Sequence, residues 1–221
     1  VEVKSGYGLN LDAELASLGI IKRLQFDPDV LIDLVPTCLA AHTVPPEFEG
    51  NTTGYVQFVT NEILPAVAKD RLAEFADVYV EKGAFNADEG LAILRRAAEL
   101  RLGLKIHVGQ MNDIGGIAAL AAAGLRLTSA DHLEKISPAG IAQLKDMGAV
   151  AVLMPFCNLR LQQDYKADAQ ALINQGVRVA ISTDTNPGSS PSDSLQNVAG
   201  LAHLHYRMQP IDVISAVTYN A

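Results

Sequence analysis

Short apolar stretches rich in β-branched residues alternate with longer amphipathic stretches along the whole 221-residue chain. The short stretches predict strands at Val1–Ser5, Leu34–Ala41, Asp77–Val80, Leu104–Val108, Leu125–Ser129, Val150–Met154 and Val177–Ile181. The longer stretches predict helices at Asn10–Leu24, Gly54–Leu72, Ala87–Leu102, Ile114–Ala123, Ser137–Met147, Ala167–Gln175, Ser192–His205 and Pro210–Thr218. Seven β/α units in strict alternation are typical of a parallel sheet, either an open doubly wound sheet or a barrel.

Individual residues predict how some of these helices begin and bend. Asn10 is placed to cap the first helix, and Pro138 stands at a favoured first helical position. Pro65 lies inside the second predicted helix and is expected to kink it, because proline lacks an amide hydrogen. Arg95 and Arg96 are expected on the solvent side of the third helix.

The turn after the first predicted strand favours a barrel over an open sheet. Neither G-x-G-x-x-G nor a P-loop follows that strand, which weakens a nucleotide-binding interpretation. The number of units is one short of the eight in a (β/α)8 barrel. The chain begins Val-Glu-Val-Lys without Met and stops at Thr-Tyr-Asn-Ala, within or just after a helical pattern. We therefore expect residues 1–221 to be a single partial TIM-barrel catalytic domain, a fragment without its first strand.

Composition narrows the classes of partner. The net charge is −8 and there is no basic run, so we expect neither nucleic acid nor an anionic membrane surface as a partner. No apolar run approaches the roughly 20 residues that span a membrane, and the N-terminus lacks a signal-peptide pattern. Cys38 and Cys157 stand far apart in apolar contexts, which favours buried thiols in a reducing compartment. We expect a cytoplasmic protein.

Chemically versatile side chains follow several predicted strands, at the carboxyl ends where parallel β/α proteins carry out chemistry. Asp184 follows the last strand and opens a Pro/Gly turn, while His42, His107 and His132 lie at the ends of earlier strands. Taken alone, Asp184 could equally cap a helix, and a single histidine is more often a hydrogen-bonded structural residue. Three histidines and an aspartate at one rim favour a site instead.

This set of side chains suits metal-assisted hydrolysis. A divalent ion held by imidazole and carboxylate lowers the pKa of bound water to about 7, and a nearby acid or base can take the proton. His107 and Asp184 are the best ligand candidates, and His132 could be a ligand or a general acid/base. Catalytic sites usually need at least three protein ligands, so two are too few. The remaining histidines, His203 and His205, fall on a late helix and are expected to be structural or surface residues.

Four motifs, found in order along the chain, carry a resemblance to a known family. They are Val1-Glu-Val-Lys-Ser-Gly-Tyr-Gly-Leu9, Ala41-His-Thr-Val-Pro-Pro-Glu47, Ser129-Ala-Asp-His-Leu-Glu134 and Thr183-Asp-Thr-Asn-Pro-Gly-Ser-Ser-Pro191. With them the chain resembles the imidazolonepropionase family of the amidohydrolase superfamily. The resemblance implies a metal-dependent (β/α)8 barrel, with Zn²⁺ or Fe bound, that hydrolyses 4-imidazolone-5-propanoate to N-formimidoyl-L-glutamate in histidine degradation. Homodimers are common in this family.

The resemblance also implies roles for individual residues. His107 and Asp184 match metal ligands, and Asp184 is expected to act as a base as well. His132 matches a catalytic histidine that acts on the substrate carbonyl or on water. The positions that match substrate contacts are Tyr7, His42, Gln110, Asn186 and Gly188.

The chain departs from the family pattern at three places. The His-x-His pair that supplies two metal ligands is absent. The usual His-Ala-Asp-Gln/Glu motif reads His107-Val-Gly109-Gln110, which removes a carboxylate, and a Pro-x-Ala-Phe-Tyr-Phe-Leu motif reads Pro155-Phe-Cys-Asn-Leu-Arg160. These departures leave two alternatives open, a related cyclic amidohydrolase or deaminase with another substrate, and an inactive barrel fragment that holds no metal.

Overall fold

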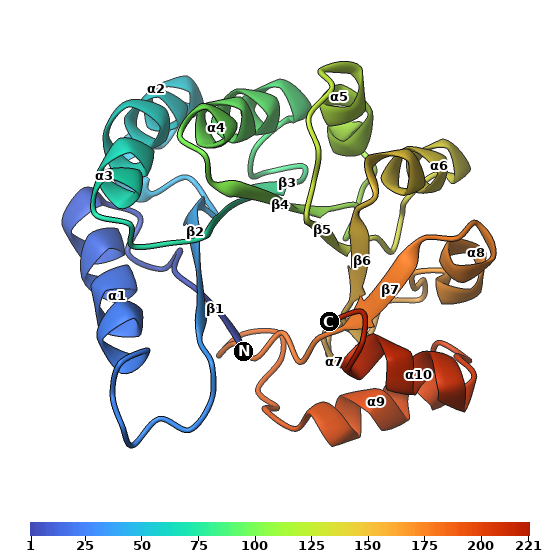
Figure 1. Cartoon of the computed structure of the whole chain (residues 1–221). Helices are drawn as coiled ribbons and strands as arrows, with labels where there is room; N and C mark the ends of the chain where they lie inside the picture. The colour runs from blue at the N-terminus through green and yellow to red at the C-terminus, as the bar shows by residue number, and fades with distance from the viewer. The chain divides into compact units, whose positions relative to one another are not determined.

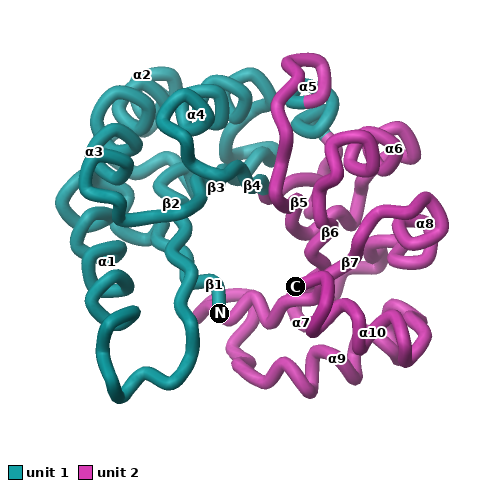
Figure 2. Tube along the Cα trace, viewed as in Figure 1, with its two compact units in different colours: residues 1–106, 114–120 teal, residues 107–113, 121–221 magenta.

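The computed structural model describes all residues, 1–221, and their contacts divide the chain into two compact units (Figure 2). Unit 1 comprises Val1–Ile106 and Ile114–Leu120, and unit 2 comprises His107–Asp113 and Ala121–Ala221. Each unit is described by itself. None of the helices combines the length and the apolar character that crossing a membrane requires.

Unit 1 is a parallel sheet with helices packed against it (Figure 1). Its elements are β1 (Glu2–Lys4), α1 (Leu11–Leu24), β2 (Val35–Ala41), the 3₁₀ helix η1 (Pro46–Phe48), α2 (Thr52–Phe58), η2 (Val59–Ile63), α3 (Leu64–Lys69), β3 (Phe75–Val80), α4 (Ala87–Glu99) and the start of β4 (Gly103–Val108). Strand β1 pairs in parallel with β2, and β2 pairs in parallel with β3. Leu18, Tyr55, Ile63 and Phe85 are fully buried between sheet and helices. Asn10 caps α1 as predicted, because its side chain accepts from the amide of Ala13.

The long helix expected at 54–72 contains a change of helix type before Pro65. It runs as α2, then as the π-helix η2, then as α3, with Pro65 near the start of α3. In the π turn the Leu64 amide donates to Val59 O, five residues back. The next such bond would need an amide hydrogen on Pro65, which has none. The carbonyl of Thr60 accepts instead from Arg96 Nε at 3.2 Å, so Arg96 is not simply a solvent-facing residue as expected.

Unit 2 holds the end of β4 and three further parallel strands. Its elements are the end of α5 (Gly116–Ala122), β5 (Ser129–His132), α6 (Pro138–Met147), β6 (Val150–Leu153), α7 (Pro155–Arg160), α8 (Ala169–Asn174), β7 (Arg178–Ile181), α9 (Leu195–Leu204) and α10 (Pro210–Val217). Strand β6 lies between β5 and β7 and pairs in parallel with both. Ser137 caps α6, with Pro138 at its first turn as predicted. Helix α7 was not expected from the sequence.

The prediction of a strand at 125–129 is wrong, because the strand lies further along the chain. Strand β5 begins at Ser129, where the predicted strand ends, and its residues pair Ser129 with Val150, Ala130 with Ala151 and Asp131 with Val152. The run Leu-Arg-Leu-Thr before it has the stronger strand propensity, but the paired position next to β6 is occupied by the polar segment Ser-Ala-Asp-His. Pairing and burial override local propensity here. As a result Asp131 and His132 belong to the strand itself.

We expect replacement of Gly6 by alanine to destabilise unit 1 by about 2–5 kcal/mol. Gly6 follows β1 at φ +113°, and an added Cβ would lie 2.5 Å from the carbonyl oxygen of Leu39 in β2. That oxygen belongs to a buried strand and cannot swing aside. Chemical unfolding followed by circular dichroism measures the loss.

Gly19 provides a matched control in the same unit. It lies within α1, and an added Cβ would meet nothing within 4 Å. Alanine there should stabilise the chain by about 0.5–1 kcal/mol, because glycine is entropically costly inside a helix. Equal stability of the Gly6→Ala and Gly19→Ala variants would contradict the close approach of β1 and β2.

Candidate functional site

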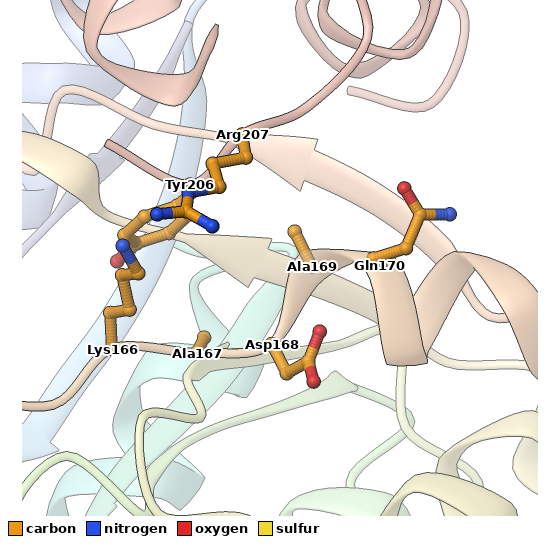
Figure 3. A pocket seen from close by; sticks show the side chains of 7 residues that line it. All are labelled: Lys166, Ala167, Asp168, Ala169, Gln170, Tyr206 and Arg207. Carbon is orange, nitrogen blue, oxygen red and sulfur yellow. The ribbon is translucent and has the colours of Figure 1, made fainter. Parts of the chain in front are cut away.

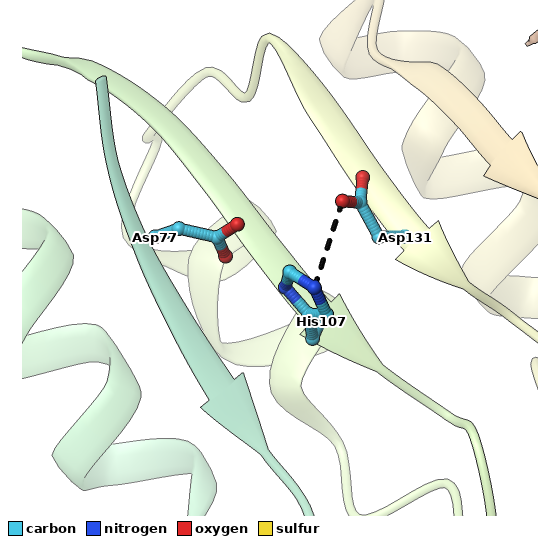
Figure 4. Close-up of side chains that lie close together, drawn as sticks. All are labelled: Asp77, His107 and Asp131. Carbon is cyan, nitrogen blue, oxygen red and sulfur yellow. Dashed lines mark ion pairs between the residues drawn. The ribbon is translucent and has the colours of Figure 1, made fainter. Parts of the chain in front are cut away.

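His107 and Asp131 of unit 2 form a buried imidazole–carboxylate pair. His107 lies near the end of β4, and its Nε2 is 3.8 Å from Oδ2 of Asp131 on β5 (Figure 4). The other oxygen of Asp131 accepts from Ser129 Oγ at 3.0 Å, which holds the carboxylate in place. Asp77, also drawn in Figure 4, belongs to β3 of unit 1, where it forms an ion pair with Lys4 at 2.7 Å. All three acid and imidazole side chains are buried, and each offers an atom that can bind a metal.

His132 ends β5 with its ring beside that of His107. The ring centroids are 5.4 Å apart and the ring planes meet at 56°. His132 is only 4% exposed, so its imidazole is withdrawn from bulk water. The structure therefore brings together two of the histidines that the sequence placed at strand ends.

The backbone at His132 is in an unusual conformation. His132 has φ +78° and Leu133 has φ +71°, the left-handed region that residues with a side chain seldom adopt. Two hydrogen bonds tie this segment to the end of β4, from Leu133 N to Val108 O and from Lys135 N to Gly109 O. Strained backbone of this kind persists where the surroundings hold it and is common at functional sites.

Asp184 is carried by a tightly bonded turn after β7. It is half-buried, has φ +49°, and its amide donates to Ser182 Oγ at 3.2 Å. Asn186 organises the turn, since its Nδ2 donates to Asp184 O at 2.7 Å and its Oδ1 accepts from the amides of Gly188 and Ser189. The side chain of Asn186 and the amide of Gly188 are thus engaged in holding the turn that carries Asp184.

Cys157 on α7 connects Gln110 with the Asp184 turn. Gln110 Nε2 lies 3.7 Å from Cys157 Sγ. Burial raises the pKa of the Cys157 thiol to about 12, and a hydrogen bond from Ser189 and the charge of Asp184 act on it in opposite directions. Cys157 is therefore a neutral buried thiol beside Asp184. Both cysteines are free and buried, as the sequence predicted.

Tyr7 and His42 lie together in unit 1. Their rings meet edge to face with centroids 5.4 Å apart, and His42 Nδ1 donates to Gly6 O at 3.1 Å. Tyr7 is 66% exposed, so its hydroxyl and ring face can be reached by a ligand. That both residues contact substrate stays a prediction.

The two late histidines have structural partners. His203 Nδ1 donates to Met208 O at 2.9 Å, and His205 Nε2 donates to Asn158 Oδ1 at 2.8 Å. Burial and the nearby charge of Lys166 lower the pKa of His205. These contacts agree with the structural roles expected for them.

A cavity of about 590 Å³ opens elsewhere on unit 2 (Figure 3). It is lined by Lys166, Ala167, Asp168, Ala169, Gln170, Tyr206 and Arg207. None of the site residues expected from the sequence borders it, and its charged residues carry both signs. It is not part of the candidate site.

Two buried acids of this region were given no role from the sequence, Asp131 beside His107 and Glu134 beside His132. Glu134 Oε1 lies 3.8 Å from His132 Nδ1. Both acids stand in the motif Ser129-Ala-Asp-His-Leu-Glu134, so the sequence contained them. The order of residues in the motif does not show which acid faces which histidine. The bend at His132 and Leu133 decides that.

Comparison with known proteins finds relatives of this chain that are named imidazolonepropionase. It is 43% identical to the imidazolonepropionase of Caldanaerobacter subterraneus subsp. tengcongensis over all of its own length and 52% of that protein. It is 40% identical to an imidazolonepropionase of Streptococcus gordonii, again over its whole length and over 70% of that sequence. No family model matches the chain. The chain spans about half the length of most of the curated relatives that it matches.

Solved structures show the fold. Guanine deaminase from C. acetobutylicum, with bound guanine in the active site, superposes with a TM-score of 0.73 at 12% identity, covering 100% of this chain and 57% of that one. An amidohydrolase from an environmental sample of the Sargasso Sea gives a TM-score of 0.67 at 15% identity, covering 99% of this chain and 53% of that one. The predicted α/β fold, a partial (β/α)8 TIM barrel, is thereby confirmed.

Proposed function

Because this chain belongs to the imidazolonepropionase family, we propose that it forms the part of a metal-dependent hydrolase that opens 4-imidazolone-5-propanoate to N-formimidoyl-L-glutamate in histidine degradation. This step would break a carbon–nitrogen bond in a cyclic amide. The observation that carries the proposal is the buried set in unit 2, where His107 pairs with Asp131 at 3.8 Å and stands against His132. Homodimeric assembly and a cytoplasmic location are proposed from the same family membership.

The donor groups fit one divalent ion, Zn²⁺ or Fe. Imidazole and carboxylate are ligands that both metals accept. His107 and Asp184 would hold the ion, and the Asp131 carboxylate behind His107 would fix the orientation of the imidazole, as second-layer acids do at metal sites. When bound, such an ion lowers the pKa of water and polarises a carbonyl.

The remaining chemistry is assigned to residues of unit 2. Asp184 is proposed to take the proton from the attacking water and to pass it to the leaving ring nitrogen. His132 is proposed to act on the attacking water, from which the ring nitrogen that does not face Glu134 accepts a hydrogen bond. Gln110 is proposed to hydrogen-bond a ring nitrogen of the substrate.

Substrate positioning is proposed for the remaining family positions. Tyr7 and His42 would orient the substrate ring by hydrogen bonds, and the edge-to-face contact between them would limit their movement. Asn186 and Gly188 are proposed to contribute by shaping the turn at Asp184, because their polar groups are bonded within it. A Cβ added at Gly188 would lie 3.4 Å from Asn186 Oδ1, the atom that accepts from the Gly188 amide.

A second candidate is a related cyclic amidohydrolase or deaminase. The observation that favours it is the contact of Gln110 with Cys157, which stands on the helix α7 that replaces the family's aromatic segment. The Cys157 thiol also lies close enough to Asp184 for the carboxylate to raise its pKa. The likeness to guanine deaminase in fold is compatible with such a ring substrate.

Metal content and turnover of the purified chain test the proposal together. We expect about one Zn²⁺ or Fe per chain by elemental analysis, and hydrolysis of 4-imidazolone-5-propanoate faster than other cyclic amides, guanine and adenosine. Preferred turnover of another ring would support the second candidate. A folded chain without metal and without binding of N-formimidoyl-L-glutamate by calorimetry would overturn the assignment for this chain.

A further inference from the structure

Glu134 has a buried carboxylate with no hydrogen bond. Its side chain is 1% exposed, and both carboxylate oxygens lack a hydrogen-bond partner. Its ion pair is with His132, whose Nδ1 lies 3.8 Å from Oε1 and is itself buried without a hydrogen bond. A buried ionised carboxylate normally costs several kcal/mol unless it is paired and bonded. Such an exception requires an explanation.

We propose that Glu134 is the positioning residue of His132 and holds its imidazole in the tautomer that carries the proton on Nδ1. This inference rests on the proposed function, in which the other ring nitrogen, Nε2, accepts a hydrogen bond from the attacking water. A carboxylate facing one imidazole nitrogen fixes both the ring orientation and the tautomer, and it raises the basicity of the other nitrogen. Nδ1–H would point at Glu134, and Nε2 would present its lone pair.

The backbone aims the two side chains at each other. His132 and Glu134 are two residues apart, a spacing that in an extended strand would give both side chains the same face but hold them several Å apart. The left-handed conformations of His132 and Leu133 replace the extended path with a bend. Hydrogen bonds to Val108 O and Gly109 O anchor the bend on β4. The separation of 3.8 Å is longer than a hydrogen bond, as is common for catalytic contacts before the substrate binds.

Among the side chains near Glu134, His132 is the one that faces its carboxylate and can pair with it. Burial raises the pKa of Tyr206 far above its usual value, and the charge of Glu134 adds to the effect. Cys157 is likewise neutral, with Glu134 a minor contributor to its raised pKa of about 12. Tyr206 and Cys157 are therefore neutral and add no negative charge beside Glu134, and the nearby cation Lys135 lies over the Tyr165 ring, 3.3 Å from its centroid.

Imidazole ¹⁵N NMR of the chain at alkaline pH, where histidines are neutral, tests the inference without turnover. His132 should show the Nδ1–H tautomer in the wild type, keep it in Glu134→Gln, whose amide oxygen still accepts, and change to Nε2–H in Glu134→Leu. His203 is an internal reference, because its Nδ1 donates to a backbone carbonyl in every variant. An Nε2–H tautomer in the wild type, or no change in Glu134→Leu, would overturn the inference.

Thermal unfolding separates positioning from a structural role. Removal of a buried carboxylate without hydrogen bonds should raise Tm by about 2–4 °C in a chain of this size. A structural contact would instead lower Tm in both variants while leaving the tautomer unchanged, which would contradict the proposal.

Turnover distinguishes this inference from the proposed function. If the chain hydrolyses 4-imidazolone-5-propanoate, kcat should fall about 10–100-fold in Glu134→Leu, with KM nearly unchanged and partial recovery in Glu134→Gln. An unchanged kcat in an active chain would overturn the positioning role. If the wild type is inactive, the proposed function fails for this chain, and the tautomer measurement still decides whether Glu134 controls His132.

Discussion

Replacing either His107 or Asp184 with alanine is expected to remove the bound metal and with it all turnover. Loss of a residue behind a metal ligand already lowers affinity about 10–100-fold, so loss of a ligand should lower it by more than about 100-fold. The effect is largest here because few ligands are proposed. Elemental analysis after gel filtration, followed by competition with a chelator, measures the change.

The controls for this prediction are chosen within unit 2. His203→Ala removes an imidazole that donates only to Met208 O, and it should leave the metal content unchanged. Asp131→Asn should lower the metal affinity by an intermediate factor of about 10–100. Asp131 is not one of the proposed ligands, but its carboxylate lies 3.8 Å from the imidazole of His107. Metal retained at full occupancy in His107→Ala would remove His107 from the ligand set. Equal losses in His203→Ala would indicate unfolding rather than ligation.

Replacing His132 with alanine is expected to lower kcat about 10²–10⁴-fold while the metal remains bound, because a positioned acid or base contributes a factor of this size. His132 contacts His107 through its ring, at 5.4 Å between centroids, but it is not one of the proposed ligands. The measurement is steady-state hydrolysis of 4-imidazolone-5-propanoate with metal content determined on the same sample.

The changes in kcat and KM together show how His132 acts. A group that acts in the transition state lowers kcat and kcat/KM together, whereas a group used only for binding raises KM. Metal lost from His132→Ala would show that His132 is a ligand, the alternative that the sequence left open. Full activity with full metal would exclude His132 from the reaction.

Local signals predicted much of the fold. Helices α1 and α6 begin where the sequence places them, capped by Asn10 and Ser137. The strands β2, β4 and β7 lie within one or two residues of their predicted bounds. Such boundaries depend on residues that are close in sequence, so local chemistry suffices to predict them.

Predictions failed where distant residues compete with local propensity. The strand β5 is the polar segment from Ser129 to His132, because pairing with β6 selects it over the more apolar run before it. At Pro65, where the sequence predicted a kink, the helix changes type through the π-helix η2, and the sequence did not reveal that Arg96 of α4 donates to the Thr60 carbonyl. Strand β6 and Arg96 are both distant in sequence from the residues that they contact, so local patterns do not reveal them.

The candidate site divides in the same way. The sequence by itself determined the class of fold, the residue types at the strand ends and, through four motifs, the family. Only the tertiary structure decided which acid faces which histidine: Asp131 lies beside His107, and Glu134 lies beside His132. It also showed that the Asn186 side chain forms its hydrogen bonds within the turn at Asp184. The physical reason is that alternation and capping act over a few residues, whereas the direction of a buried side chain depends on strand pairing and on backbone strain such as that at His132 and Leu133.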